Sequence, residues 1–285
     1  MTTNSSRPAA DPVGGTACKA AVLGFPIEHS RSPDLHRAAY RALGLDGWTY
    51  ERIECPAGEL ATIVDNLDEA YLGLSVTMPG KGEALAYAAT VTERAALVGS
   101  ANTLVRRADG WFADCTDIDG VTGALGAVGA DFTGGGSAVV LGAGGTARPA
   151  LAALAAAGAE EAVVVVREPA RAVAALELAE SLSLAARVLR FDDDDALAGA
   201  LSASTAVVST VPAPAGTLLT SAIDGPVRLV DAIYNPWPTP LADRVAETGG
   251  TAVGGLVMLL NQAYRQVELF TGLPAPREAM AAVLA

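Results

Sequence analysis

The chain has 285 residues, a formal net charge of −13 and a hydrophobic fraction of 51%, of which only a small part is aromatic. This length predicts roughly two domains, and the alanine-rich apolar content predicts helices packed on sheets of small aliphatic residues. The acidic balance argues against nucleic acid or an anionic membrane as a partner, because both require a cationic face.

The N-terminal residues and the cysteines predict a soluble cytoplasmic protein without a cysteine metal site. Residues 1–18 are rich in Thr, Ser, Pro, Gly and Ala and lack the basic start and apolar stretch of a signal peptide, so we expect a flexible tail. Cys18, Cys55 and Cys115 are widely spaced, which favours reduced thiols in a cytoplasmic protein over a metal site. No charge-free apolar run reaches the roughly 20 residues that cross a membrane.

Strands and helices alternate through the first half of the chain. One helix start is explicit, because Ser32 supplies a hydroxyl cap, Pro33 the first helical position and Asp34 an acid in the first turn. Asp109-Gly110 predicts the turn of a hairpin. The predicted strands are 19–25, 48–54, 72–77, 101–106 and 111–113, and the predicted helices are 32–43, 57–68, 83–89, 92–98 and 117–128.

The second half predicts a doubly wound parallel sheet, because strands and helices alternate at short, regular spacing. Asp192–Asp195 has the composition of a metal site, but four consecutive acids cannot converge on one ion, so we expect a solvated loop. The predicted strands are 138–141, 162–166, 187–191, 206–210 and 227–231, and the predicted helices are 147–157, 170–182, 255–270 and 276–284.

A glycine turn between the strand 138–141 and the helix 147–157 indicates a dinucleotide site. Gly142 allows the sharp turn, Gly144 lets the backbone approach a pyrophosphate, and Ala147 lets helix and strand pack closely. The following helix offers N–H groups and its positive dipole end to the phosphates.

The end of the next strand carries conflicting signals about the cofactor. In a dinucleotide fold this point meets the adenosine ribose, where an acid favours NAD and arginines favour the 2′-phosphate of NADP. Here Arg167 and Arg171 accompany Glu168, and a plain surface helix start is the alternative interpretation.

Short polar segments in the first half are each open to two interpretations. Ser30 and Ser32 could hold a small anion, or Ser32 could only cap its helix while Ser30 faces solvent. Lys81 follows Thr77 in a Pro/Gly loop and could equally be a solvated surface charge. The segments around Asn102 and Asp117 resemble ordinary caps and turns when each is taken alone.

Taken together, these segments resemble the shikimate dehydrogenase family from about Lys19 to Ala285, with the motifs in the order of the family. The matched motifs are His29-Ser-Arg-Ser-Pro33, Ser75-Val-Thr77-Met-Pro79-Gly-Lys81, Gly99-Ser-Ala-Asn102-Thr103, Thr116-Asp117, Gly142-Ala-Gly-Gly145, Tyr234-Asn-Pro-Trp-Pro-Thr239 and Gly255-Leu-Val-Met258-Leu-Leu-Asn-Gln262.

The resemblance implies a role for each matched residue. Lys81 and Asp117 would be the catalytic pair, with Lys81 as acid/base. The implied substrate ligands are Ser30, Ser32, Thr77, Lys81, Asn102, Asp117, Tyr234 and Gln262. The implied cofactor ligands are Gly142, Ala143, Gly144, Gly145, Thr146, Arg167, Glu168, Arg171, Ala232 and Gly255, while Glu93 falls at a position that the family sometimes uses near the cofactor.

The chain departs from the family at several of these places. The family usually has Asn where this chain has Ser75 and Cys115, both of which neighbour implied substrate ligands. At the 2′-phosphate site only Arg167 matches the family pattern, with Arg171 further along. Two guanidiniums can still clamp a phosphate, whereas Glu168 would repel it, and the balance favours NADP while leaving NAD open.

The resemblance therefore implies a two-domain α/β enzyme that reversibly reduces 3-dehydroshikimate to shikimate with NADPH, on the way to chorismate and the aromatic amino acids. The expected domains are 19–117 with 253–285 for substrate and catalysis, and 118–252, Rossmann-like, for NADP. The alternatives are an NAD-dependent quinate/shikimate dehydrogenase and a non-catalytic ligand sensor on the same fold. A monomer and a homodimer are both compatible with the sequence.

Overall fold

The computed structural model describes residues 17–284, which form two compact units. Unit 1 comprises the described residues up to Ala96, Ser100–Thr116 and the described residues from Ala263. Unit 2 comprises Leu97–Gly99 and Asp117–Gln262. The predicted tail lies outside the described residues up to residue 16, and the first strand begins at Cys18.

Unit 1 is built on a six-stranded mixed sheet with the order β2-β1-β3-β5-β6-β4. Strands β1, β2 and β3 are parallel, and β5 is antiparallel to both β3 and β6. The strands are β1 (Cys18–Gly24), β2 (Trp48–Glu54), β3 (Tyr71–Val76), β4 (Thr90–Val91), β5 (Thr103–Arg107) and β6 (Gly110–Asp114).

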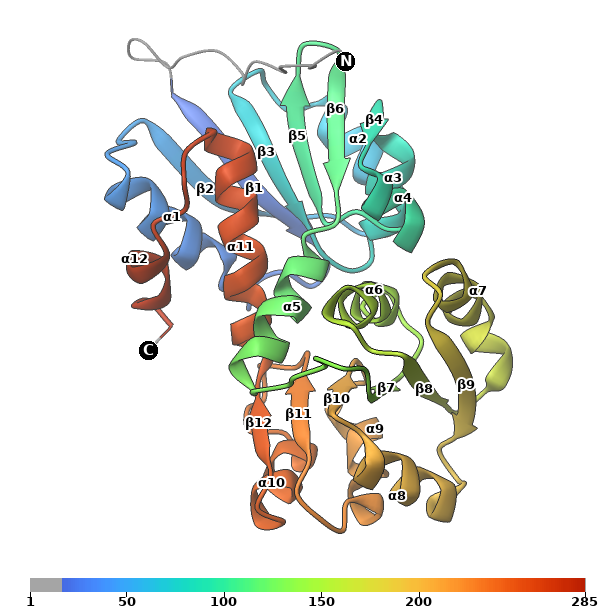
Figure 1. Cartoon of the computed structure of the whole chain (residues 1–285). Helices are drawn as coiled ribbons and strands as arrows, with labels where there is room; N and C mark the ends of the chain where they lie inside the picture. The colour runs from blue at the N-terminus through green and yellow to red at the C-terminus, as the bar shows by residue number, and fades with distance from the viewer. Residues whose placement is uncertain (1–16, 285) are drawn as a thin grey trace. The chain divides into compact units, whose positions relative to one another are not determined.

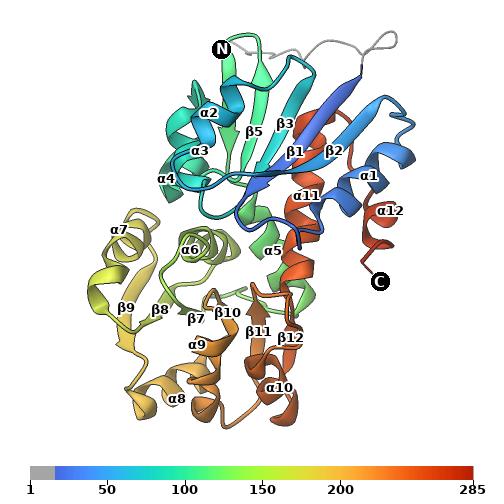
Figure 2. The ribbon, with the colours of Figure 1, turned by 180° about the vertical axis from the view of Figure 1, so that it is seen from behind.

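Helices cover both faces of this sheet, and the alternation of side chains along β3 shows why. Leu74 and Val76 point into an apolar cluster with Leu60 and Ala84, on the face covered by α2 and α3. Gly73 lies on the opposite face, where a Cβ would collide with the ring of Phe270 on α11 (Figures 1 and 2). The helices of this unit are α1 (Ser32–Ala42), α2 (Leu60–Asp65), α3 (Lys81–Tyr87), α4 (Glu93–Val98, whose last residues belong to unit 2), α12 (Arg277–Ala281) and the second part of α11 (Gly255–Thr271).

Unit 2 contains a six-stranded sheet, β12-β11-β10-β7-β8-β9, in which every pair is parallel. The chain winds outward from β7 to β9, returns to β10 beside β7, and winds outward again, which is the doubly wound order of dinucleotide-binding folds. The strands are β7 (Ser137–Leu141), β8 (Glu161–Val166), β9 (Ala185–Arg190), β10 (Ala206–Ser209), β11 (Arg228–Asp231) and β12 (Thr251–Val253).

The apolar runs of the inner strands β7, β8, β10 and β11 are buried on both faces, as parallel sheets require. Helices α5 (Asp117–Ala127), α6 (Ala147–Ala157) and α7 (Val173–Ser181) cover one face (Figure 1). The other face packs against α8 (Asp194–Ala203), α9 (Ala213–Thr217), α10 (Pro240–Glu247) and the 3₁₀ turn η2 (Thr220–Ala222). A second 3₁₀ turn, η1 (Pro169–Ala172), precedes α7.

Several predicted elements differ from the structure. The run Asp192–Asp195 is not a loop throughout, because α8 begins at Asp194. Asp194 and Asp195 lie in the first turn of this helix, where their negative charges interact favourably with the helix dipole. The predicted helix 57–68 shortens to α2, and the predicted helix 170–182 divides into η1 and α7. The short elements β4, α9, α10 and β12 are absent from the prediction.

The predicted capping role of Ser32 is wrong. Helix α1 begins at Ser32 itself, after Arg31, and has no side-chain capping bond. The side chain of Ser32 instead lies near Tyr50, where it opposes the rise that burial causes in the pKa of the Tyr50 hydroxyl.

Helix α11 is continuous across the division between the units. The predicted domains change at residue 253, whereas the units change after Gln262, inside this helix.

Candidate active site

The strand directions of unit 1 bring several predicted site residues to one edge of its sheet. Strand β6 runs parallel to β3, because both are antiparallel to β5, so β1, β3 and β6 end where β5 begins. Backbone bonds join these ends, from Thr77 N to Leu23 O at 2.8 Å and from Asn102 N to Asp114 O at 3.2 Å. We call this edge the carboxyl edge, and it carries Ser30, Thr77, Asn102 and Thr116.

The loop after β1 and the start of α1 hold the two predicted anion ligands, Ser30 and Ser32. Ser30 Oγ accepts a bond from Ser32 N at 3.3 Å, and the guanidinium of Arg52 donates twice to Ser30 O, at 2.5 and 3.1 Å. Ser32 is buried near Tyr50, while Ser30 is half-buried. Neutral hydroxyls in a loop restrained this way can hold a carboxylate by hydrogen bonds.

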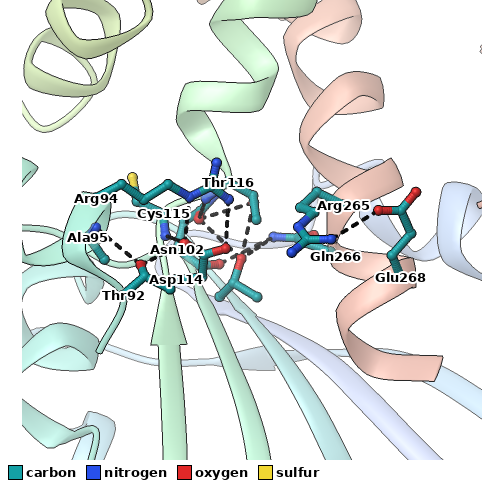
Figure 3. A network of polar contacts seen from close by, with 11 residues as sticks. Thr92, Arg94, Ala95, Asn102, Asp114, Cys115, Thr116, Arg265, Gln266 and Glu268 are labelled. Carbon is teal, nitrogen blue, oxygen red and sulfur yellow. Dashed lines mark hydrogen bonds and ion pairs between the residues drawn. The ribbon is translucent and has the colours of Figure 1, made fainter. Parts of the chain in front are cut away.

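Asn102 is buried at the start of β5, and its amide orientation is determined by a neighbour that can only donate. Thr116 N donates to Asn102 Oδ1 at 2.7 Å, and the hydroxyls of Thr103 and Thr116 also donate to this oxygen, each at 3.1 Å (Figure 3). Because a backbone N–H cannot accept, the oxygen end of the amide faces Thr116. The nitrogen end, with its two N–H donors, therefore faces the other way.

An ion pair fixes the chain where β6 ends. Asp114 is buried, and Arg94 donates to both of its oxygens, at 2.7 and 2.6 Å (Figure 3). Thr92 Oγ1 and Cys115 N donate to Asp114 Oδ1, each at 2.8 Å. Burial raises the pKa of the Asp114 carboxyl, but the bonds and charge of Arg94 outweigh it and hold that pKa below its ordinary value. The segment that leads into Thr116 is thereby anchored to α4.

Lys81 occupies the first turn of α3, five residues after β3 ends, and is half-buried. A cation at a helix N-terminus opposes the helix dipole, so local helix stability does not explain a lysine here. Its carbonyl oxygen accepts from Ala101 N at 3.0 Å, which ties the lysine backbone to the residue before Asn102. A residue that contradicts a local rule at such a place is a candidate for function.

The glycine turn of unit 2 follows β7, at the point where the strand order reverses. Gly142 has φ +99°, and a Cβ there would lie 2.7 Å from Thr210 Oγ1, so only glycine fits. Gly144 and Gly145 are exposed, and a Cβ at either position would meet nothing within 4 Å. Helix α6 begins at Ala147, which is fully buried, and no side chain caps it. Main-chain N–H groups and a helix dipole beside an open glycine turn fit a pyrophosphate.

Strand β8 ends beside this turn, since Gly142 N donates to Val165 O at 2.8 Å. Arg167, Glu168 and Arg171 follow it, and all three are exposed. A further cation, Arg190, ends the neighbouring strand β9. Its bond to Asp192 is the main cause that raises its pKa, and the charge of Glu168 raises it further.

The remaining predicted residues belong to unit 2. Gly255, at the start of α11, donates to Ile233 O at 3.0 Å, and a Cβ on it would collide with Ala232 O. The structure thus brings Ala232 and Gly255 together. Tyr234 and Gln262 are half-buried, on the segment after β11 and on α11. Asp117 is buried at the start of α5, so the predicted catalytic pair has Asp117 in unit 2 and Lys81 in unit 1.

Models of known protein families match most of the chain. Residues 22–104 match the shikimate dehydrogenase substrate binding domain and residues 255–285 the shikimate 5′-dehydrogenase C-terminal domain. Residues 138–253 match the saccharopine dehydrogenase NADP binding domain. The shikimate dehydrogenase (NADP(+)) of Methylobacterium radiotolerans is 37% identical over 270 residues, which cover 91% of this chain and 93% of that protein.

The chain belongs to the shikimate dehydrogenase family.

Solved structures of the family share this fold. The crystal structure of Mycobacterium tuberculosis shikimate dehydrogenase is 52% identical, with a TM-score of 0.88 and coverage of 93% of this chain and 99% of that one. Thermus thermophilus shikimate 5-dehydrogenase, in complex with NADP(H) and shikimate, is 30% identical, with a TM-score of 0.76 and coverage of 93% and 98%.

The sequence did not point to two further residues, Gln266 and Arg190, which the structure places near predicted site residues. Gln266 is a buried amide one helical turn after Gln262 on α11, and its polarity within an apolar helix face was the available signal. Arg190 was recognisable as a cation at the end of the strand that follows β8 in the predicted sheet.

The described residues contain no group of three or more His, Cys, Asp or Glu arranged to hold a metal ion. Among residues 17–284, no helix combines the length and apolarity that a membrane crossing requires.

Proposed function

We propose that this protein is an NADP-dependent shikimate dehydrogenase that reversibly reduces 3-dehydroshikimate to shikimate, a step toward chorismate and the aromatic amino acids. The observation that carries the proposal is the carboxyl edge, where polar residues distant in sequence gather in the first half of a chain of this family. Relatives named as NADP(+)-dependent, and a family structure in complex with NADP(H) and shikimate, support it.

The substrate is a carboxylate with ring hydroxyls, and the proposed ligands suit both parts. Ser30 and Ser32 bind the carboxylate through hydroxyl donors. Asn102 presents its nitrogen end to a substrate hydroxyl, since its oxygen faces Thr116. The other proposed ligands of the hydroxyls and ring are Thr77, Tyr234 and Gln262.

Lys81 is the proposed acid/base. NADPH, when bound, supplies the hydride that reduces the ketone carbon. The ammonium of Lys81 donates a proton to the ketone oxygen, which becomes the hydroxyl of shikimate, and in the reverse direction the amine of Lys81 takes that proton back. Asp117 orients the lysine and offsets its charge.

The glycine turn of unit 2 fits the cofactor because its exposed glycines and uncapped helix start leave main-chain N–H groups available. Arg167 and Arg171 hold the adenosine 2′-phosphate through charge-assisted bonds. Glu168 opposes them, but it also lies near the cation Arg190, which offsets part of its charge. Ala232 and Gly255 lie beside the nicotinamide. The residues proposed for the pyrophosphate are Gly142, Ala143, Gly144, Gly145 and Thr146.

The decisive experiment measures kcat/KM for shikimate and quinate oxidation with NADP⁺ and with NAD⁺. We expect shikimate with NADP⁺ to give the highest value. Arg167→Ala is expected to raise KM for NADP⁺ about tenfold and to leave KM for NAD⁺ unchanged, because only NADP⁺ carries the phosphate.

The matched control is Arg187→Ala, which removes another half-exposed guanidinium, paired with Glu161 across β8 and β9. It should leave both KM values unchanged. A higher kcat/KM with NAD⁺ and quinate would contradict the proposal, and reduction of neither cofactor would favour the ligand sensor.

A further inference from the structure

Gln266 is a buried amide to which the proposed reaction assigns no role, yet it is fully hydrogen-bonded. Its Oε1 accepts from Ser75 Oγ at 2.7 Å and lies 3.2 Å from His36 Nε2. Its Nε2 donates to Thr103 Oγ1 at 3.1 Å and to Asn102 O at 3.3 Å. A carbonyl oxygen cannot donate, so the nitrogen end of Gln266 faces β5 and its orientation is fixed.

The first branch from Gln266 leads to the side chain of Asn102. Because Gln266 Nε2 donates to the hydroxyl of Thr103, that hydroxyl directs its own hydrogen to another acceptor, and Asn102 Oδ1 lies 3.1 Å away. The same oxygen accepts from Thr116 N. Gln266 therefore helps to hold the oxygen end of the Asn102 amide against Thr103 and Thr116, away from the proposed substrate.

The second branch leads to Ser32. Tyr50 OH donates to Ser75 Oγ at 2.7 Å, and the side chain of Ser32 lies near this hydroxyl, where it opposes the effect of burial on the Tyr50 pKa. Tyr50 is fully buried, and this burial raises the pKa of its hydroxyl, which keeps the group neutral and able to donate. Ser75 stands where the family usually has Asn, and its single hydroxyl joins Tyr50 to Gln266.

We propose that Gln266 is a positioning residue that sets the shikimate affinity of the carboxyl edge without touching the substrate. It orients Asn102 through Thr103, and through Ser75 and Tyr50 it couples that amide to Ser32. The inference rests on the proposed function, because Asn102 and Ser32 are proposed substrate ligands. We call Tyr50, Ser75, Gln266, Thr103 and Asn102 the amide network.

The test replaces Gln266 with residues of similar size. Gln266→Met removes both hydrogen-bonding ends, and we expect KM for shikimate to rise about tenfold while KM for NADP⁺ stays unchanged. Gln266→Glu keeps a neutral acid at low pH and becomes a carboxylate at higher pH, which would repel Asn102 O. We expect its KM for shikimate to rise with pH, through an ionisation that the wild type lacks.

Val267→Ala is the matched control, because Val267 is fully buried on the same helix and takes no part in the amide network. It should lower Tm and leave KM for shikimate unchanged. Unchanged KM for shikimate in a folded Gln266→Met variant would overturn the inference, and so would equal increases in KM for shikimate and NADP⁺.

A second readout needs no activity and separates this inference from the proposed function. In a crystal structure of Gln266→Met, we expect the Asn102 amide to leave the position in which Oδ1 lies 2.7 Å from Thr116 N. If the amide keeps that contact, the inference fails, even if the wild type proves to be an active dehydrogenase. A wild type that reduces neither cofactor refutes the proposed function, while this structure still decides the positioning role.

Tyr50→Phe provides a milder variant should Gln266→Met not fold. It removes one hydroxyl from the amide network and keeps the ring that stacks on His36 at 4.1 Å. We expect a smaller rise in KM for shikimate with kcat maintained. An unchanged KM would overturn the coupling to Ser32.

Discussion

The carboxyl edge of unit 1 and the glycine turn of unit 2 are held in place by different means. At the carboxyl edge, Asn102 and Ser32 are buried, and bonds from neighbouring hydroxyls and from the Thr116 N–H fix the Asn102 amide. At the glycine turn, Gly144 and Gly145 are exposed, and the shape comes from main-chain geometry, such as the positive φ of Gly142. The comparison teaches that one region is organised by neighbouring side chains before a ligand binds, whereas the other presents the backbone itself.

Lys81→Ala gives the largest expected effect and tests whether the carboxyl edge carries the chemistry. Loss of the acid/base should lower kcat about 10²- to 10⁴-fold. KM for shikimate should change far less, because the buried ligands remain. Steady-state kinetics measures both. Lys19→Ala, which removes a partly exposed lysine paired with Asp68, should leave both constants unchanged. A kcat near the wild-type value in Lys81→Ala would contradict the assignment of Lys81 as the acid/base.

Arg94→Ala tests how strongly side-chain bonds hold the carboxyl edge. Asp114 would remain buried without its cationic partner, and we expect a loss of about 2–3 kcal/mol in unfolding free energy, measured by denaturant titration near neutral pH. The control is Arg187→Ala, which breaks a half-exposed pair with Glu161 and should cost at most about 1 kcal/mol. Equal losses in the two variants would show that burial of Asp114 does not matter here.

Two alanine substitutions in the glycine turn test separate properties. Gly142→Ala tests the backbone conformation, and Gly144→Ala tests the free space beside the main chain. Gly142→Ala forces a side chain into a left-handed backbone conformation and against Thr210, so we expect a stability loss of about 1–3 kcal/mol. Gly144→Ala meets no protein atom, so Tm should hold while the added methyl group hinders the approach of the pyrophosphate and raises KM for NADP⁺. Thermal unfolding and NADP⁺ titration distinguish the two. A loss of stability in Gly144→Ala but not in Gly142→Ala would contradict the account of how the glycine turn is held in place.

At neutral pH His36 gives the smallest effect, and its pH signature belongs to unit 1, since the histidines of the chain are His29 and His36. Burial lowers the pKa of His36 from 6.5 to about 3, against a smaller raising effect of its bond to Gln266. Its aromatic neighbours, Tyr40, Tyr50 and Phe270, carry no charge in this range.

The folded protein therefore keeps His36 neutral while the unfolded chain binds a proton below pH 6.5, so unfolding free energy falls as pH falls from 6.5 toward 3. The contribution of this group approaches about 1.4 kcal/mol per pH unit. Denaturant titrations across this range measure it, and His36→Phe should show a smaller slope. An identical slope in the two proteins would assign the effect to other groups.

Local sequence patterns predicted helices and strands better than they predicted the hydrogen-bond partners of side chains. Helix α6 and strand β2 have the predicted bounds, because periodicity and flanking glycines define them. Two similar helix starts behaved differently, however. Thr239 before Pro240 accepts from Ala242 N and caps α10, whereas Ser32 before Pro33 makes no capping bond and lies near Tyr50. The deciding neighbour of Ser32 is 18 residues away, beyond the reach of a local pattern.

In the candidate site, too, local patterns predicted one feature and missed another. The glycine turn was recognisable because spacing alone specifies its geometry, and the structure agrees at Gly142 and Ala147. The amide network was not recognisable from the sequence, because the bond between Ser75 and Gln266 joins residues 191 positions apart. A lone glutamine on a helix carries no sign of such a partner, so only the fold could reveal it.

The position of Gln266 after unit 2 in the sequence has a consequence for synthesis on the ribosome. Most of unit 1 is translated first, then nearly all of unit 2, and only then the part of α11 that supplies Gln266. Until that residue emerges, Ser75, Thr103 and Asn102 lack the bonds that Gln266 makes to them. Folding from the N-terminus onward, which serves chains of consecutive domains, cannot finish unit 1 here. The nascent protein completes the sheet of unit 1 with a helix that is made after unit 2.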